Sequence, residues 1–259
     1  LGNTLRDDKR LLEAVTSYKA ALAAKPDFAM AQHNIGTSLQ ELGRTEEAIT
    51  YLEQVDTTLS RPSLLECIYT LANKSKFYRE LKHIAEKDQI NVAVAAISAF
   101  ASHQFNCPDP YPFCNNPLNF IRKKNLLTDD IVDRNFLDII VEDLFNLNLG
   151  GGNQSLLYSG FQSTGTLFIE PQGSLAQLAE ILKKEIDAYF LDYNDSDCLL
   201  VRRRPQDYIL NGWYIVMTKG GFLKPHNHPS GWLSGVMYLK IPSKNDQDGD
   251  IEFGLHGKD

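Results

Sequence analysis

Residues 1–55 contain a pattern that returns after 34 residues. Small and apolar residues recur in phase at this offset: Leu1-Gly2-Asn3-Thr4-Leu5 returns as Ile35-Gly36-Thr37-Ser38-Leu39, and Ala14, Tyr18 and Ala21 return as Ala48, Leu52 and Val55. A repeat of this length is typical of helix pairs that bury their apolar faces by stacking on one another. The N-terminal part of the chain is therefore predicted to be a stack of helix pairs.

This pattern resembles the tetratricopeptide repeat, in which a short turn joins two helices. Gly43 lies where that turn is expected, and Lys9 takes the same place one period earlier. Small side chains let the helices approach closely, so Gly36 and Ala48 are expected at the helix crossing. Because Leu1 corresponds to the seventh position of a repeat, we expect the chain to begin inside a helix, with at least part of a helix upstream.

A third helix pair is predicted between residues 64 and 84 from its apolar spacing, although the small residues are missing. We interpret it as a capping repeat, since terminal repeats are atypical. The apolar run at 90–100 has eleven residues, and a bilayer-spanning helix needs about 20. It predicts a packed helix and not a membrane span. The repeats are expected to bind a protein or peptide partner.

The stretch from Cys107 to Pro117 contains four prolines, which exclude a helix there and predict a domain boundary. The predicted organisation is helical repeats at 1–105, a Pro-rich linker at 106–118 and a second domain at 119–259. In that domain, the spacing predicts a helix at 129–144, a flexible turn at the triple glycine 150–152 and an exposed strand or hairpin at 160–168. An amphipathic helix is predicted at 175–189, with Ser174 as its N-cap.

His226 and His228 lie two residues apart between two strand-like runs, Trp213–Met217 and Leu233–Leu239. On an extended backbone the side chains alternate between faces, so both imidazoles are expected on one side and Asn227 on the other. Two imidazoles on one side can share a metal ion. Imidazole alone does not distinguish iron, zinc, copper and nickel.

The last fifty or so residues resemble the start of the double-stranded β-helix of 2-oxoglutarate- and Fe(II)-dependent oxygenases. A bacterial branch of that family joins this domain to tetratricopeptide repeats. His226 matches the histidine of the family's His-x-Asp/Glu motif, whereas His228 replaces the carboxylate of the usual 2-His-1-carboxylate triad. The strand at 233–239 and a glycine-led strand at 249–253 follow in the family's order. The resemblance implies an α+β protein, helical repeats followed by a double-stranded β-helix (jelly roll), expected to be incomplete at both ends.

The resemblance also implies an enzyme that uses Fe(II), 2-oxoglutarate and O₂ to hydroxylate a C–H bond of a protein, peptide or metabolite. His226 and His228 are the expected metal ligands, and Tyr238 is expected to donate a hydrogen bond to the cosubstrate. The distal histidine and the arginine that binds 2-oxoglutarate are expected beyond Asp259. His256, in a turn-like Leu-His-Gly-Lys sequence, is interpreted as an exposed loop residue and not as that ligand.

Two other functions stay open: a non-enzymatic repeat scaffold with an inactive jelly roll, and a cupin-like metal enzyme that does not use 2-oxoglutarate. A downstream histidine and arginine would favour the oxygenase. The net charge of −7 argues against a general nucleic-acid binder. The four cysteines form no CxxC pair, which favours free thiols in the cytoplasm over a structural zinc site or disulfides.

Overall fold

The structure is a computed structural model that describes residues 1–147, 149–152, 156–165, 167–241 and 251–254. It consists of two compact units, Leu1–Asn115 and Asn116–Asp259. The boundary between them lies inside the Pro-rich stretch predicted as a linker. The two units are described separately.

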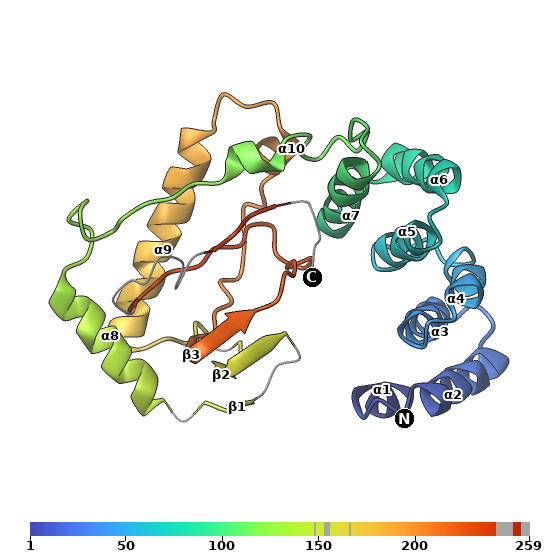
Figure 1. Cartoon of the computed structure of the whole chain (residues 1–259), viewed down its shortest axis with the longest axis horizontal. Helices are drawn as coiled ribbons and strands as arrows, with labels where there is room; N and C mark the ends of the chain where they lie inside the picture. The colour runs from blue at the N-terminus through green and yellow to red at the C-terminus, as the bar shows by residue number, and fades with distance from the viewer. Residues whose placement is uncertain (148, 153–155, 166, 242–250, 255–259) are drawn as a thin grey trace. The chain divides into compact units, whose positions relative to one another are not determined.

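The first unit is a succession of stacked α-helices (Figure 1). Each helix from α1 to α5 packs against the next one, and α7 packs against α5. This arrangement confirms the helix pairs predicted from the 34-residue period. The helices are α1 (Gly2–Asp7), α2 (Leu11–Ala24), α3 (Ala29–Glu41), α4 (Thr45–Leu52), α5 (Ser60–Thr70), α6 (Lys74–Lys87) and α7 (Val92–Gln104).

Gly36 lies where α3 and α4 approach closely. A Cβ atom at this position would lie 2.5 Å from Cγ of Leu52, which is closer than two carbon atoms can pack. The same contact occurs one period earlier, where a Cβ at Gly2 would lie 2.4 Å from Cε1 of the Tyr18 ring. Ala48, one turn before Leu52, is fully buried. The prediction that Gly36 lies at the crossing is confirmed, and the side chain that it faces is Leu52.

The turn inside each helix pair contains one residue in the left-handed region. Gly43 has φ +74°, and Lys9 and Ala72 have φ 60° and 52° at the turns of the first and third pairs. A side chain in this region costs roughly 1–2 kcal/mol, which glycine avoids. The turn predicted at Gly43 is confirmed, and the same backbone geometry forms where the sequence has lost the glycine.

The Pro-rich stretch belongs to the first unit as far as Asn115 and packs on its helices. Tyr111 is only 1% exposed, and its hydroxyl accepts a hydrogen bond from the Asn91 amide at 3.0 Å and donates one to the Asp88 carbonyl at 2.9 Å. The Asp109 carboxylate accepts from Ser98 Oγ and from the Tyr111 amide. Burial raises the pKa of Tyr111 to about 12, so the phenol stays protonated and keeps this donor.

Helix α7 confirms the packed helix predicted at 90–100, since Val94, Ile97 and Ala101 are buried. Within the part of the chain that the structure describes, no helix has both the length and the apolar character needed to cross a bilayer.

The second unit combines helices with a three-stranded antiparallel sheet of order β1-β2-β3 (Figure 1). Helix α8 packs against α9. The predicted helices at 129–144 and 175–189 are confirmed, the first beginning later than expected. The elements are η1 (Pro117–Phe120), α8 (Arg134–Asn146), β1 (Gly151–Gly152), β2 (Leu157–Ser163), α9 (Gly173–Asp192), α10 (Leu199–Arg202) and β3 (Ile215–Leu223).

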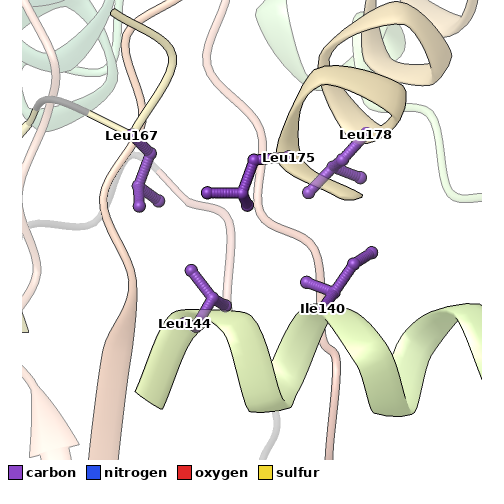
Figure 2. Packing of buried hydrophobic residues seen from close by; sticks show 5 residues of the cluster. All are labelled: Ile140, Leu144, Leu167, Leu175 and Leu178. Atoms are coloured by element: carbon purple, nitrogen blue, oxygen red, sulfur yellow. The ribbon is translucent and has the colours of Figure 1, made fainter. Parts of the chain in front are cut away.

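The core of this unit lies between α8, α9 and the segment after β2. Ile140, Leu144, Leu167, Leu175 and Leu178 point toward one another (Figure 2), and each is less than 9% exposed. Burying one such side chain stabilises a fold by about 1.5–3 kcal/mol. This cluster therefore holds α8, α9 and the segment that follows β2 together as one body.

The sequence predicts Ser174 as the N-cap of α9, and this prediction is wrong. The N-cap is Gln172, and the Ser174 hydroxyl donates to the Asp143 carboxylate of α8 at 2.5 Å. The serine therefore connects α9 to α8, whereas the sequence predicts that it caps the start of α9. At α8 it is Asp133 that caps, its carboxylate accepting from the Phe136 amide at 2.7 Å.

The sheet contains only part of the strands predicted from the sequence. The strand predicted at Trp213–Met217 is confirmed as β3, which begins two residues later and continues to Leu223. Strand β2 overlaps the strand predicted at 160–168. Residues 233–239 form no strand, although Met237 and Leu239 are partly buried and pack against the core cluster. No strand forms at 251–253 either, and Gly249 and Asp250 lie outside the described residues. The double-stranded β-helix is thus not confirmed, and a small antiparallel sheet takes its place.

The Gly36 contact predicts that the effect of Gly36→Ala on the free energy of unfolding changes sign when Leu52 is also replaced. Gly36→Ala should destabilise the protein by about 1–3 kcal/mol, because the new methyl group overlaps Leu52. With Leu52→Ala in place the overlap is gone, and the same change should stabilise by roughly 1 kcal/mol, the helix preference of alanine over glycine. Urea unfolding followed by far-ultraviolet circular dichroism measures both steps. Equal effects in the two backgrounds would contradict the contact.

Candidate functional site

Strand β2 is the centre of the sheet, and β1 and β3 pair with its two edges. Gln162 lies opposite Gly152 on one side and opposite Ile215 on the other. A Cβ atom at Gly151 would lie 2.4 Å from the Gln162 carbonyl oxygen, so only glycine allows β1 to come this close. The triple glycine, predicted as a flexible turn, therefore forms a strand at Gly151 and Gly152.

The segment after β2 runs beside the residues that precede β3. The Ser163 amide donates to the Tyr214 carbonyl, and the Tyr214 amide donates to Ser163 Oγ, both at 3.1 Å. The Leu167 amide donates to the Gly212 carbonyl at 3.1 Å. A Cβ at Gly212 would lie 2.3 Å from the Phe168 ring. These contacts fix the entry to β3 on the same body that carries Gln162.

His226 and His228 follow directly after β3. They lie in irregular backbone and not on the regular strand that their spacing predicts. Their rings nevertheless lie side by side, with centroids 4.8 Å apart and planes at 85°. The Trp213 ring lies beside them, 5.4 Å from that of His228. The structure thus brings the two predicted ligands together.

A hydrogen bond at His226 and burial at His228 suit the two imidazoles to metal binding. His226 Nδ1 lies 2.8 Å from the Lys224 carbonyl oxygen. An N–H at Nδ1 donating to this oxygen leaves the lone pair on Nε2, the arrangement usual for a metal-binding histidine. Burial, and then the charge of His226, lower the pKa of His228. A lowered pKa favours the neutral ring, which is the form that binds metal.

The histidines open onto a hollow with a volume of about 290 Å³. Asn227 lines it too, although regular alternation predicts the opposite face. Five of the eight lining residues come from outside the histidine segment 226–228. The lining residues are Leu156, Gln162, Gly165, Trp213, Leu223, His226, Asn227 and His228.

The imidazoles of His226 and His228 could supply two of the ligands of an iron site. Two imidazole nitrogens are suitable ligands for Fe(II). Over the described ranges, no group of three or more His, Cys, Asp or Glu side chains could hold a metal ion. Tyr238 is 44% exposed and is not among the residues that line the hollow. His256 lies outside the described residues.

Comparison with known families gives two matches. Residues 30–57 match the tetratricopeptide repeat model, and this range contains α4 and all of α3 except its first residue. Residues 211–256 match a family model described as "Putative 2OG-Fe(II) oxygenase", and this range contains β3 and both histidines. The chain thus joins a tetratricopeptide repeat to an oxygenase-like segment. No curated protein and no solved structure matches the chain.

The ring contact between Trp213 and His228 predicts an optical signal for metal binding. Fe(II) added without oxygen should quench Trp213 fluorescence, measured with Trp232→Phe so that one of the two tryptophans remains. His226→Ala should weaken the apparent affinity by about tenfold or more, because it removes a ligand.

The matched control for this measurement is His83→Ala, the same change at an exposed residue of α6. It should leave the titration unchanged. Equal affinities for His226→Ala and His83→Ala would show that the metal binds elsewhere.

Proposed function

We propose that this chain contains the beginning of a 2-oxoglutarate- and Fe(II)-dependent oxygenase domain, with His226 and His228 as metal ligands, and that its repeats recruit a protein or peptide. The observation that supports this most strongly is the 4.8 Å separation of the two imidazole rings inside the range matched by the oxygenase model. Two neighbouring imidazoles in the wall of a hollow are an arrangement suited to metal binding.

The whole domain would be a double-stranded β-helix with β3 as its first strand. The position of β3 directly before His226 supports this assignment. Tyr238 would donate to the cosubstrate. The third metal ligand and the group that pairs with the far carboxylate of 2-oxoglutarate would come from outside the described residues. A reducing compartment such as the cytoplasm suits the four cysteines, none of which forms a disulfide.

The bound iron would supply the oxidative decarboxylation of 2-oxoglutarate by O₂, which yields succinate and CO₂ and places the second oxygen atom in a substrate C–H bond. The protein's own residues prepare the site. A hydrogen bond from Nδ1–H to the Lys224 carbonyl would fix the His226 tautomer, and burial lowers the pKa of His228, which favours its neutral form. The Trp213 ring shields one side of His228 from water.

The test is succinate formation by the full-length protein. Loaded with Fe(II) and given 2-oxoglutarate and O₂, it should form succinate even without its true substrate, because uncoupled turnover needs only these components. His226→Ala should lower the rate by about 100-fold or more, since it removes a metal ligand. Helical content, measured by circular dichroism, should not change.

His83→Ala serves as the control and should keep the wild-type rate. If the wild-type protein releases no more succinate than His226→Ala does, the oxygenase function fails. A repeat scaffold, or a metal enzyme that does not use 2-oxoglutarate, would then take its place.

A further inference from the structure

Gln162 lines the same hollow as the histidines, but it lies on β2, whereas the histidines follow β3, and it is outside the range matched by the oxygenase model. We infer that Gln162 binds the substrate, and that the group it receives is an uncharged peptide amide. This inference rests on the proposed function, because it names the substrate class of the same site.

Gln162 has a fixed backbone and an unengaged side chain. Pairing with β1 on one edge and β3 on the other holds its main chain. Its carboxamide forms no hydrogen bond with any residue that the structure describes, and it is not one of the buried polar atoms left without a partner. Gln162 lines the hollow, so a ligand bound there would find both of its N–H donors and its carbonyl acceptor available.

The hydrogen-bonding groups of Gln162 match an amide. A carboxamide can donate from Nε2 to the carbonyl of a peptide bond and accept the peptide N–H at Oε1. An ester or a carboxylate has no N–H and would use only the donor. Gln162 thus distinguishes a peptide bond from groups of similar shape.

The walls of the hollow favour an uncharged ligand. Its described lining has no Asp, Glu, Lys or Arg side chain. A charged group without a partner is costly to bury. The remaining wall is largely apolar, since Leu156, Leu223 and the Trp213 ring lie around the histidines. An apolar side chain would rest there while Gln162 holds the adjoining peptide bond.

The size of the hollow agrees with one residue of a peptide. Its volume of about 290 Å³ is just below the range for small-molecule sites, roughly 300–1,000 Å³. Because the Trp213 ring lies 5.4 Å from that of His228, a side chain packed on Trp213 would have its C–H bonds close to the proposed metal ligands.

The test compares three ligands of similar size that differ only in the group presented to Gln162, on the metal-free full-length protein at a pH where the histidines are neutral: the methylamide N-methylisobutyramide, the ester methyl isobutyrate and the carboxylate isobutyrate. Nuclear magnetic resonance titration follows the side-chain NH₂ signals of Gln162. The methylamide should bind about fivefold to tenfold more tightly than the ester, which lacks one hydrogen bond. The carboxylate should bind most weakly.

Gln162→Met keeps the length of the side chain and removes its hydrogen-bonding groups, so methylamide and ester should bind it equally, with affinities followed on the backbone amide signals. Gln206→Met, the same change at an exposed residue outside the hollow, should keep the preference. Equal binding of amide and ester by the wild type, or a preference that survives in Gln162→Met, would overturn the inference.

A metal-binding measurement distinguishes a failure of the substrate inference from a failure of the proposed function. Gln162→Met should bind Fe(II) with wild-type affinity in the Trp213 fluorescence titration, because Gln162 is not a ligand. If metal binding depends on His226 but the amide preference is absent, only the substrate inference fails. If His226→Ala binds metal as the wild type does, the proposed function fails whatever the amide titration shows.

Discussion

The pairing of β2 with β3 is the constraint on which the candidate site depends. It places Gln162 opposite Ile215 and Leu157 opposite Leu223, so the two ends of β3 lie beside one central strand. Glycines make this possible, because a Cβ at Gly160 would lie 2.9 Å from the Val216 carbonyl and one at Gly221 would lie 2.6 Å from the Ser159 carbonyl. The pairing register shifts between Tyr158 and Gly160, and such bulges often occur next to functional sites.

The helical unit was largely predictable because its constraints repeat along the sequence. Gly2 with Tyr18 and Gly36 with Leu52 are the same contact, one period apart. The turn at Ala72 was harder to foresee, since its left-handed backbone is imposed by the packing of the third pair and not by a glycine. The Pro-rich stretch excludes a helix, but composition cannot show that Tyr111 docks on the Asp88 carbonyl, a contact distant in sequence.

The second unit was predictable where local periodicity decides the structure and not where tertiary contacts do. Apolar spacing located α8 and α9, and the two-residue spacing placed both imidazoles together even though no regular strand forms. Ser174 was assigned wrongly because a serine at a helix start can equally donate to a neighbouring helix. Residues 233–239 are strand-like in composition, but a strand also needs a hydrogen-bonded neighbour. Gln162 could not be linked to the histidines from spacing, since strand pairing alone joins them.

The central claim is that one metal ion binds to both His226 and His228. The most direct measurement is the iron K-edge X-ray absorption spectrum of the protein loaded with Fe(II) without oxygen. The account predicts scattering from two imidazoles that belong to His226 and His228, at an iron–nitrogen distance typical of histidine ligation, and the loss of one of them in His226→Ala or in His228→Ala. A spectrum without imidazole scattering, or one that neither substitution changes, would contradict the claim.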